Sequence, residues 1–257
     1  MEPAFVNNYS PPAPAVHPPS DLSSTEPYDI NFAFPLHPAT LTSSRVRITP
    51  FVPRLHAQEF WNQAALHYDA LFRYYPTAPR DLAEFLEWME YFRSKEEWCT
   101  FAVLDRTGGE ERFAGMLSLI NTSGRNLWSE IGFVMILPSF QRTHVARTAI
   151  ALMLRYLLQT PTSNPPGLGF RRVQWCAHPG NAPSIGLAKK MGFKEEGLLR
   201  WLWALPDIEC MKNVGVEVKR RGEEKPEGWA RHTAVLSLCW DDWDDGGLDR
   251  VKSIADL

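Results

Sequence analysis

Apolar side chains in this chain recur with two different spacings, one typical of helices and the other of strands. Over residues 80–95 they recur every three to four positions with glutamates between them, which predicts an amphipathic helix. Further helices are predicted over residues 54–75, 145–158 and 182–191. Short apolar runs bounded by turn residues predict strands over residues 45–53, 98–105, 112–120, 127–137, 171–178, 193–205 and 232–240. This order of elements predicts an α/β sandwich around a mixed sheet, with residues 206–231 as a polar excursion.

Proline and charge divide the chain into three parts. Nine of the 21 prolines fall in residues 1–40, which also carry four acidic residues and no Lys or Arg. Because such a composition favours extended backbone and offers no repeating apolar face, we expect a flexible tail and lead-in. The stretch after about residue 25 is expected to lie over the domain; a PxxP-type docking peptide is the alternative. Residues 41–243 are expected to form one domain, and residues 244–257 a frayed acidic tail.

Composition excludes several classes of protein. The net charge is −3 and no strongly basic stripe is visible, so we expect no nucleic-acid partner. Residues 41–240 are mildly basic. This charge either suits a small anionic ligand or is ordinary surface charge. No apolar run approaches the ~20 residues of a membrane-spanning helix, and no secretory signal is visible, so a cytoplasmic protein without membrane partners is expected. The four cysteines form no CxxC pair, so neither a metal site nor a disulfide framework is expected.

The segment from residue 130 to residue 193 carries the chemistry. Within it, a strand leads through a short loop into a helix, and a second strand–helix unit follows. The first N–H groups of a helix and its dipole favour an anion, so the first unit is matched to a diphosphate. The second helix opens with Asn181, a residue that suits a helix cap, followed by Pro183, which suits the first turn, and by the hydroxyl of Ser184.

These residues resemble the GNAT acyl-CoA N-acyltransferase superfamily, in particular the branch of the ribosomal-protein alanine acetyltransferases. The family's acyl-CoA loop, Q/R-x-x-G-x-G/A, is matched by Gln141, Arg142, Thr143, His144, Val145 and Ala146. Its second signature is matched by Asn181, Ser184, Leu187, Lys190, Gly192 and Phe193. The resemblance covers about residues 42–242. It implies a GNAT-like three-layer sandwich, whose central mixed and mostly antiparallel sheet is splayed at the acyl-CoA site.

The resemblance also implies a site for acetyl-CoA as co-substrate, with no metal. Backbone N–H groups of the strand at Phe133, Val134, Met135 and Ile136 would hold the pantetheine and the thioester oxygen. Loop amides between Arg142 and Arg147 would hold the diphosphate. The expected cofactor-binding residues are completed by Gln141, Thr143, His144, Val145, Ala146, Asn181, Ser184 and Lys190. Arg147 and Lys190 either meet the nucleotide phosphates or face solvent.

His144 departs from the family pattern, because it stands where the central loop glycine is expected. Glycine there allows an unusual φ and a close approach of the backbone to the diphosphate. Histidine tolerates positive φ better than most residues. Three interpretations are open: a tolerated variant, a phosphate contact through the ring, and a damaged loop without activity.

The implied reaction is direct attack of a neutral amine on the thioester within a ternary complex. Glu130 is the candidate base, and the alternative is an exposed carboxylate at a strand edge or paired with a helix. His178 is a weaker candidate for the base, and the alternative is a structural, hydrogen-bonded histidine. The family's thiolate-protonating tyrosine corresponds to Ala188, so Ser184 either contacts the CoA sulfur or is a first-turn helix hydroxyl.

The expected function is therefore N-acetylation of a primary amine, carried by a small molecule or a peptide, by a monomer or homodimer. Acylation of a hydroxylamine or hydroxyl group is one alternative, and a non-catalytic acyl-CoA binder is the other. The acceptor site is expected between the helices of residues 54–95 and the strand around residues 199–205. Aromatic residues there either line an acceptor pocket or pack the core: Trp61, Tyr68, Tyr74, Tyr75, Trp88, Trp201 and Trp203.

Overall fold

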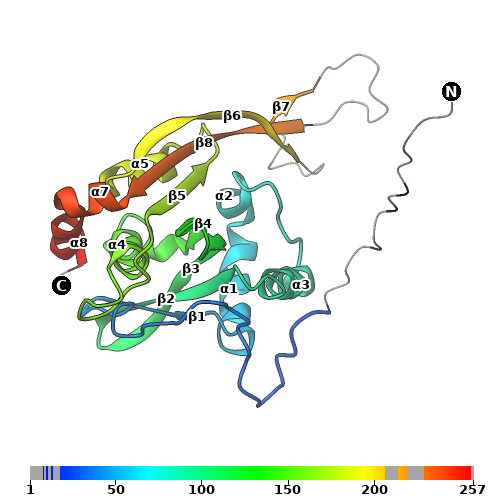
Figure 1. The fold of residues 1–257 in the computed structure, drawn as a ribbon. Coiled ribbons are helices and arrows are strands. Elements are labelled where there is room, and N and C mark those ends of the chain that lie inside the picture. Colours follow the sequence, from blue (N-terminus) through cyan, green and yellow to red (C-terminus); the bar gives the residue numbers. More distant parts are fainter. Residues whose placement is uncertain are drawn as a thin grey trace.

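The computed structural model describes Asn8, Ser10, Ala13 and residues 18–205, 214–218 and 229–255. Its centre is an eight-stranded sheet with helices on both faces (Figure 1). The strands are β1 (Val46–Pro50), β2 (Cys99–Gly108), β3 (Glu110–Ser123), β4 (Trp128–Ile136), β5 (Arg172–Ala177), β6 (Lys194–Leu205), β7 (Val216–Glu217) and β8 (Trp229–Cys239). The longer helices are α1 (Pro53–Leu66), α2 (Tyr68–Phe72), α3 (Leu82–Arg93), α4 (Val145–Leu158), α5 (Ala182–Met191) and α8 (Leu248–Ala255). Short helical turns are η1 (Pro138–Phe140), α7 (Trp240–Asp242) and η2 (Trp243–Gly247).

The strands are ordered β1-β2-β3-β4-β5-β8-β6, with β7 paired to β8. Among the described strands, β4 and β5 form the one parallel pair, and all other neighbours are antiparallel. The parallel register ends where Glu130 lies opposite Gln174. Beyond this point β4 continues to Ile136 and β5 to Ala177, but the two strands no longer pair with each other, so the sheet opens between them. This topology confirms the predicted mixed, mostly antiparallel sheet and its splayed centre.

Two hydrophobic cores lie on opposite faces of the sheet. Along β2, Phe101 and Val103 belong to the core beneath α4, whereas Ala102 and Leu104 belong to the core beneath α1 and α3. Successive side chains of a strand point to opposite faces, so a strand covered on both sides reads as an almost continuous apolar run. The molecule therefore has three layers, with α1–α3 on one side of the sheet and α4, α5 and α8 on the other (Figure 1).

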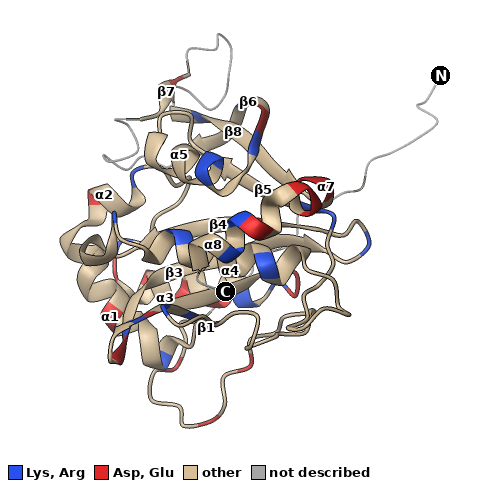
Figure 2. Ribbon diagram, turned by 90° about the vertical axis from the view of Figure 1, so that its left-hand side faces the viewer, with Lys and Arg blue, Asp and Glu red and all other residues tan. Residues whose placement is uncertain are grey.

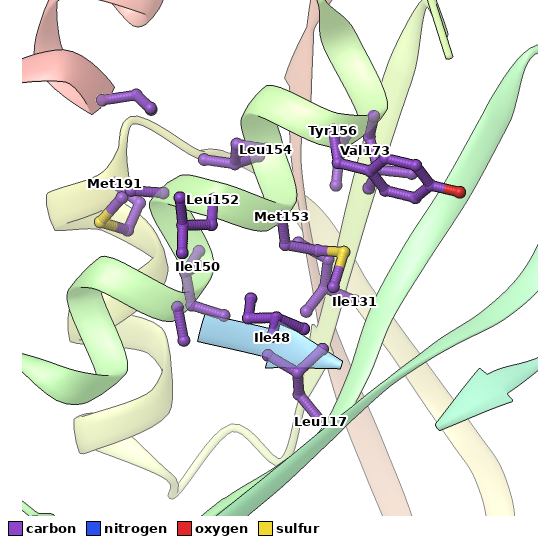
Figure 3. Packing of buried hydrophobic residues seen from close by; sticks show 14 of the residues in the cluster. Ile48, Leu117, Ile131, Ile150, Leu152, Met153, Leu154, Tyr156, Val173 and Met191 are labelled. Carbon is purple, nitrogen blue, oxygen red and sulfur yellow. The ribbon is translucent and has the colours of Figure 1, made fainter. Parts of the chain in front are cut away.

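Helix α4 is the most deeply enclosed helix of the described chain, with twelve of its fourteen residues buried. Figure 3 shows Ile150 and Met153 directed toward Ile48 and Leu117 of the sheet, and Leu152 toward Met191 of α5. Helix α8 packs against α4 as well. Because neighbours surround α4, its sequence is apolar on nearly every side, as the pattern over residues 145–158 indicated.

Local capping explains which helix bounds could be predicted. Helix α5 has the predicted bounds because the Asn181 side chain accepts a hydrogen bond from the Ser184 N–H at one end. At the other end Gly192 adopts the left-handed conformation, with φ of 102°. The single helix predicted over residues 54–75 is instead α1 and α2, divided at His67, whose φ and ψ of −127° and 29° are not helical.

The C-terminal residues differ from the prediction of a frayed acidic tail. They form α8, in which Val251 and Ala255 are buried, and Trp243 just before it is also buried. Among the described acidic residues that suggested a tail, Asp244, Asp245 and Asp249 are exposed, and a few apolar positions were enough to dock the segment on α4.

The lead-in to β1 lies against the domain. Its apolar side chains Ile30, Phe32, Phe34 and Leu36 pack on the core that contains α4. Buried Arg155 of α4 donates hydrogen bonds to the carbonyl oxygens of Ala39, Thr40 and Thr42. Much of the predicted flexible tail, residues 1–7, 9, 11–12 and 14–17, lies outside the described residues, as do residues 206–213 and 219–228 of the predicted excursion.

Strand β6 forms one edge of the sheet and is exposed along almost its whole length. Its exposed apolar side chains are Leu198, Leu199, Trp201, Leu202 and Trp203. The pairing with β8 is interrupted between Leu199 and Trp203, where Trp201 has a φ of 57° and donates its backbone N–H to Nδ1 of His232. This irregularity is a β-bulge that turns the strand at its exposed edge. No helix in the described ranges is long and apolar enough to cross a membrane.

Candidate active site

A cavity of about 700 Å³, including its open mouth, lies where β4 and β5 separate. The two diverging strands, the start of α5, the loop after α2 and the β6–β8 pair all contribute to its walls. The lining side chains with polar or aromatic groups are Tyr74, Tyr75, Glu130, Phe133, Trp175, Cys176, His178, Asn181, Ser184, Trp203 and Arg231. The cavity is thus a cleft with aromatic and aliphatic walls and a few convergent polar groups, as expected of a small-molecule site.

A β-bulge in β4 shapes the floor of the cavity. Met135 pairs with Met116 and Gly132 pairs with Ser118, so two residues of β4, Phe133 and Val134, face a single residue of β3. Phe133 accordingly has a φ of 49°. The Tyr75 hydroxyl donates a 2.9 Å hydrogen bond to the Val134 carbonyl oxygen and so holds the bulge from the α2 side. A bulge interrupts the ladder and leaves backbone groups available, here beside the gap between β4 and β5.

Glu130 lies at the inner end of this gap and is only 8% exposed. Gln174 Nε2 donates a 2.9 Å hydrogen bond to Glu130 Oε2. Burial raises the pKa of the Glu130 carboxyl, although hydrogen bonds from neighbouring side chains, Gln174 first among them, oppose the shift. The alternative of an exposed edge carboxylate is therefore wrong. A buried carboxyl with a raised pKa is suited to accept a proton near neutral pH.

Ser184 and Asn181 meet at the start of α5. The Ser184 N–H donates to Asn181 Oδ1 at 3.2 Å, and Trp175 Nε1 donates to Ser184 Oγ at 3.0 Å. Because Oγ accepts the indole hydrogen bond, the hydroxyl proton is free to be donated into the cavity. Ala188, at the position of the family's tyrosine, is fully buried and has no group to donate.

His178 closes the end of β5 and both of its ring nitrogens are used. Nδ1 accepts the Gly180 N–H at 2.9 Å, so Nε2 carries the proton and donates to the Val214 carbonyl oxygen, also at 2.9 Å. Burial lowers the pKa of His178, so the ring stays neutral. These contacts favour the structural role over that of a base.

The turn between β4 and α4 is built by its own side chains. Gln141 Nε2 donates to the Ile136 carbonyl oxygen at 2.9 Å, and Thr143 Oγ1 donates to that of Phe140 at 2.6 Å. Arg142 supplies the left-handed step, with φ of 61°. At the start of α4 the His144 side chain makes no capping hydrogen bond, and Thr143 Oγ1 accepts the Val145 N–H at 3.3 Å. The following first-turn N–H groups, such as that of Ala146, have no intrahelical acceptor. The turn thus has the geometry of an anion site.

His144 does not occupy a position that needs glycine, because its φ and ψ of −70° and −24° are helical. Its ring nitrogen Nε2 lies 3.1 Å from Oδ1 of buried Asp105 on β2. The same carboxylate accepts a 2.7 Å charged hydrogen bond from Arg112 and is hydrogen-bonded by Thr107. The ring is therefore directed at Asp105, which favours a tolerated variant over a phosphate contact through the ring.

The structure brings only part of the predicted site into the cavity. Glu130, Phe133, Val134, Asn181 and Ser184 line it. The side chains of Met135 and Ile136 are instead buried in the two cores, which leaves their backbone as the only group they could offer. The loop from Gln141 to Arg147 lies at the start of α4 and does not line the cavity. Arg147 and Lys190 are exposed, and Figure 2 shows basic positions on α5, the helix that carries Lys190 in its last turn.

Some of the aromatic residues expected near the acceptor line the cavity, and others pack the core. Tyr74, Tyr75 and Trp203 line the cavity. Trp61, Tyr68 and Trp88 pack against the core beneath α1 and α3. Trp201 is 51% exposed and contacts the His232 ring edge-on.

Three lining residues with polar or aromatic side chains, Trp175, Cys176 and Arg231, were not singled out from the sequence, nor was Gln174, which holds Glu130 beside the cavity. Gln174, Trp175 and Cys176 are consecutive residues of a strand that was predicted, so their position next to His178 could have indicated them. Arg231 is 6% exposed, and its Nη1 donates a 2.7 Å hydrogen bond to the Tyr74 carbonyl oxygen. Its only sequence signal is a cation next to the apolar run over residues 232–240.

One group within the described residues could offer three metal-ligand atoms, from Cys239, Asp241 and Asp242. Asp242 already accepts the Cys239 N–H and pairs with Lys194. The group lies at the opposite end of β8 from Arg231, away from the cavity. We assign it no part in the site.

Solved structures share this fold at low sequence identity. A GCN5-related N-acetyltransferase from Brucella melitensis is 23% identical, with a TM-score of 0.65, covering 83% of each chain. Mycobacterium smegmatis RimJ, solved with CoA-disulfide, is 18% identical with a TM-score of 0.59, covering 81% of this chain and 88% of RimJ. Vibrio cholerae spermidine N-acetyltransferase, solved with CoA and spermine, is 16% identical with a TM-score of 0.57, covering 78% of this chain and 98% of that enzyme.

The family assignment rests on the sequence itself. No curated protein matches the chain. Residues 45–194, more than half of the chain, match the family described as "Acetyltransferase (GNAT) domain". The matched range includes the splayed strands β4 and β5, the turn before α4, and helices α4 and α5. The chain therefore belongs to the GNAT acetyltransferase family.

Proposed function

We propose that this protein transfers an acetyl group from acetyl-CoA to a primary amine by direct attack in a ternary complex. The observation that carries the proposal is the position of Glu130, a buried carboxyl with a raised pKa in the gap between β4 and β5. Membership of the GNAT family and the CoA-containing structures of RimJ and spermidine N-acetyltransferase support acetyl-CoA as the donor.

The two ends of acetyl-CoA would be held by different parts of the chain. The diphosphate would lie at the turn before α4, where amides between Arg142 and Arg147 surround the start of the helix. The pantetheine would follow β4, whose bulge at Phe133 and Val134 leaves backbone groups beside the gap. A donor N–H there would also stabilise the negative charge that forms on the thioester oxygen during reaction.

The reaction requires a neutral amine. Its nitrogen attacks the thioester carbon, the new C–N bond forms, and the C–S bond then breaks to release CoA thiolate. Glu130 takes the proton that the nitrogen loses, directly or through one water molecule. The thiolate takes up a proton, and we assign the hydroxyl of Ser184, whose Oγ accepts the Trp175 indole N–H, as its donor. A thiol with a pKa of about 8.5 is a good leaving group, so this donor can be weak.

An assay of thiol release tests the proposal. The purified protein is incubated with acetyl-CoA and amines that include amino acids, peptides, polyamines and arylamines, and the acetylated product is identified by mass spectrometry. Turnover that yields an N-acetylated amine supports the proposal. Tight binding of acetyl-CoA without turnover on any amine would overturn it in favour of a non-catalytic binder, and turnover on hydroxylamines or alcohols alone would move the activity to those acceptors.

A further inference from the structure

The guanidinium of Arg231 is a buried cation in the wall of the cavity. Arg231 is 6% exposed, and among the described residues no carboxylate lies within ion-pair distance of it. Nη1 is fixed by the Tyr74 carbonyl oxygen, whereas Nε is buried without a hydrogen-bond partner. A charged group removed from water without a full set of partners is costly, so such groups in native proteins call for an explanation.

The neighbours of Arg231 do not supply the missing negative charge. Tyr75 and Cys176 stay neutral, because burial raises the pKa of the phenol and raises that of the thiol to about 12. Burial also lowers the pKa of His178, which keeps its ring neutral. Within the described ranges, Glu130 is the carboxyl that acts on Arg231, and it does so from beyond ion-pair distance while Gln174 holds it.

We propose that Arg231 binds a carboxylate of the acceptor, so that the acceptor is an amine that also carries a carboxylate, as amino acids do. This inference rests on the proposed function and narrows its substrate class. A guanidinium presents paired N–H groups that match the two oxygens of a carboxylate. With Nη1 turned to Tyr74, the edge that contains Nε remains for that contact.

The other walls of the cavity agree with this class of acceptor. Trp203, Tyr74 and Trp175 offer aromatic surface for an apolar side chain. Glu130 would take a proton from the amine at the same time as Arg231 holds the carboxylate. A polyamine, the acceptor that the Vibrio cholerae enzyme's name gives for that protein, would bring a further positive charge against Arg231.

Matched acceptor pairs test the inference in the unmodified protein. L-phenylalanine is compared with phenethylamine, and L-tryptophan with tryptamine, because the members of each pair differ by one carboxylate. We expect kcat/KM to be at least about 10-fold higher for each amino acid than for its partner amine, measured at equal concentrations of the neutral amine form. Calorimetric binding of the same four compounds to the protein saturated with CoA gives a readout that does not depend on turnover.

Two variants locate the effect. In Arg231→Met the preference for the carboxylate is expected to vanish, mainly through a rise in KM for the amino acids, while the partner amines change less than about 3-fold. Arg231→Lys keeps the charge but loses the paired donors, so an intermediate preference is expected. Arg125→Gln, in the exposed turn between β3 and β4 and outside the cavity lining, is the control and should leave the preference unchanged. Unaltered acetyl-CoA affinity shows that each variant is folded.

The outcomes separate this inference from the proposed function. Turnover with no preference within either pair overturns the carboxylate role and leaves amine acetylation in place. Binding of the amino acids, lost in Arg231→Met, without any turnover supports the carboxylate role and overturns the catalytic function. Absence of binding and of turnover for all four compounds, or a preference that survives in Arg231→Met, overturns the assignment of Arg231.

Discussion

Glu130 on β4 accepts a 2.9 Å hydrogen bond from Gln174 on β5 at the last paired position before the two strands separate. The carboxyl therefore sits where the sheet changes from a continuous ladder to an open cleft. This placement buries the group among strand residues and still lets it line the cavity. It also explains why the carboxyl is held in one orientation, since its partner is fixed by the neighbouring strand.

Replacement of Glu130 by Gln tests the proposed base. The variant keeps the shape of the side chain and is expected to lower kcat/KM on the order of 100-fold at neutral pH. Because a base must be ionised and burial raises the pKa of Glu130, the rate of the parent protein should fall as pH decreases through that raised pKa. At high pH the amine is already neutral, so the variant should then approach the parent. Rates are measured from about pH 6 to about pH 9.

A constant ratio of variant to parent rates over that range would exclude Glu130 as the base. Stability provides the internal control. A carboxyl with a raised pKa in the folded state is destabilising once ionised, so Glu130→Gln should have an unfolding temperature equal to or above the parent at pH 8. Glu195→Gln, which removes an exposed carboxylate paired with Lys189, should leave the rate unchanged.

The diphosphate site is tested at Ala146, in the first turn of α4. In Ala146→Asp a carboxylate would face the diphosphate, and acetyl-CoA affinity is expected to fall at least about 10-fold, or about 1.4 kcal/mol. In Ala146→Asn the new side chain has the shape of Asp but no charge, so this variant should lose much less affinity for acetyl-CoA. An acidic residue in the first turn favours the helix, so the unfolding temperature of Ala146→Asp should not fall. Equal affinities of both variants and the parent would place the phosphates elsewhere.

Tyr75 is expected to act as a positioning residue, because its hydroxyl holds the Val134 carbonyl oxygen at the bulge. Tyr75→Phe keeps the ring that stacks on Phe133 but releases the bulge. We expect kcat to fall about 10-fold, with a smaller change in KM for acetyl-CoA, since a slight displacement of a catalytic donor is costly. Tyr28→Phe removes a comparable hydroxyl, bonded to Glu90 outside the cavity, and should leave kcat unchanged. A rise in KM for acetyl-CoA with an unchanged kcat would contradict the positioning role.

Asp105 links the turn before α4 to the β2–β3 hairpin. Although burial opposes ionisation, hydrogen bonds from Arg112 and Thr107 hold the pKa of Asp105 below its ordinary value of 3.8. A lowered pKa stabilises the folded state above about pH 4, and this contribution is lost as pH falls through the folded pKa. Asp105→Asn should therefore reduce the free energy of unfolding by about 2 kcal/mol at pH 7.

Urea unfolding at several pH values measures that difference, which should shrink as the pH falls below about 4. Because the ring of His144 would lose its partner, the affinity for acetyl-CoA should fall as well. Asp249→Asn, an exposed carboxylate of α8, is the control and should change neither quantity. A difference in stability that is independent of pH would contradict an ionised Asp105.

Local signals made the centre of the fold predictable. The bounds of α4 and α5 follow from apolar spacing and from the caps Asn181 and Gly192, which act over a few residues. Glu130 and Ser184 reach the cavity because a strand and a helix start carry them there, in keeping with the site that the resemblance implied. The resemblance implied a backbone role for Phe133 and its neighbours, but the bulge at Phe133 depends on pairing with β3, which no local pattern states.

Long-range contacts account for what the sequence did not predict. Arg231 is buried against a loop far away in the chain, where the carbonyl oxygen of Tyr74 accepts its hydrogen bond. Helix α8 is ordered because Val251 and Ala255 meet α4, whereas the surrounding acidic residues suggested a tail. At His144 the sequence left three interpretations open, and the approach of Asp105 from another strand favours the tolerated variant over a phosphate contact through the ring.

The bulge of β6 at Trp201 has a consequence for how the protein behaves at high concentration. An edge strand with exposed indole and leucine side chains is a template onto which a further chain could add. The left-handed residue and the backbone N–H already donated to His232 break the straight row of free polar groups that such an addition needs. Changes that straighten this short stretch are therefore expected to reduce solubility before they affect the distant α4 core.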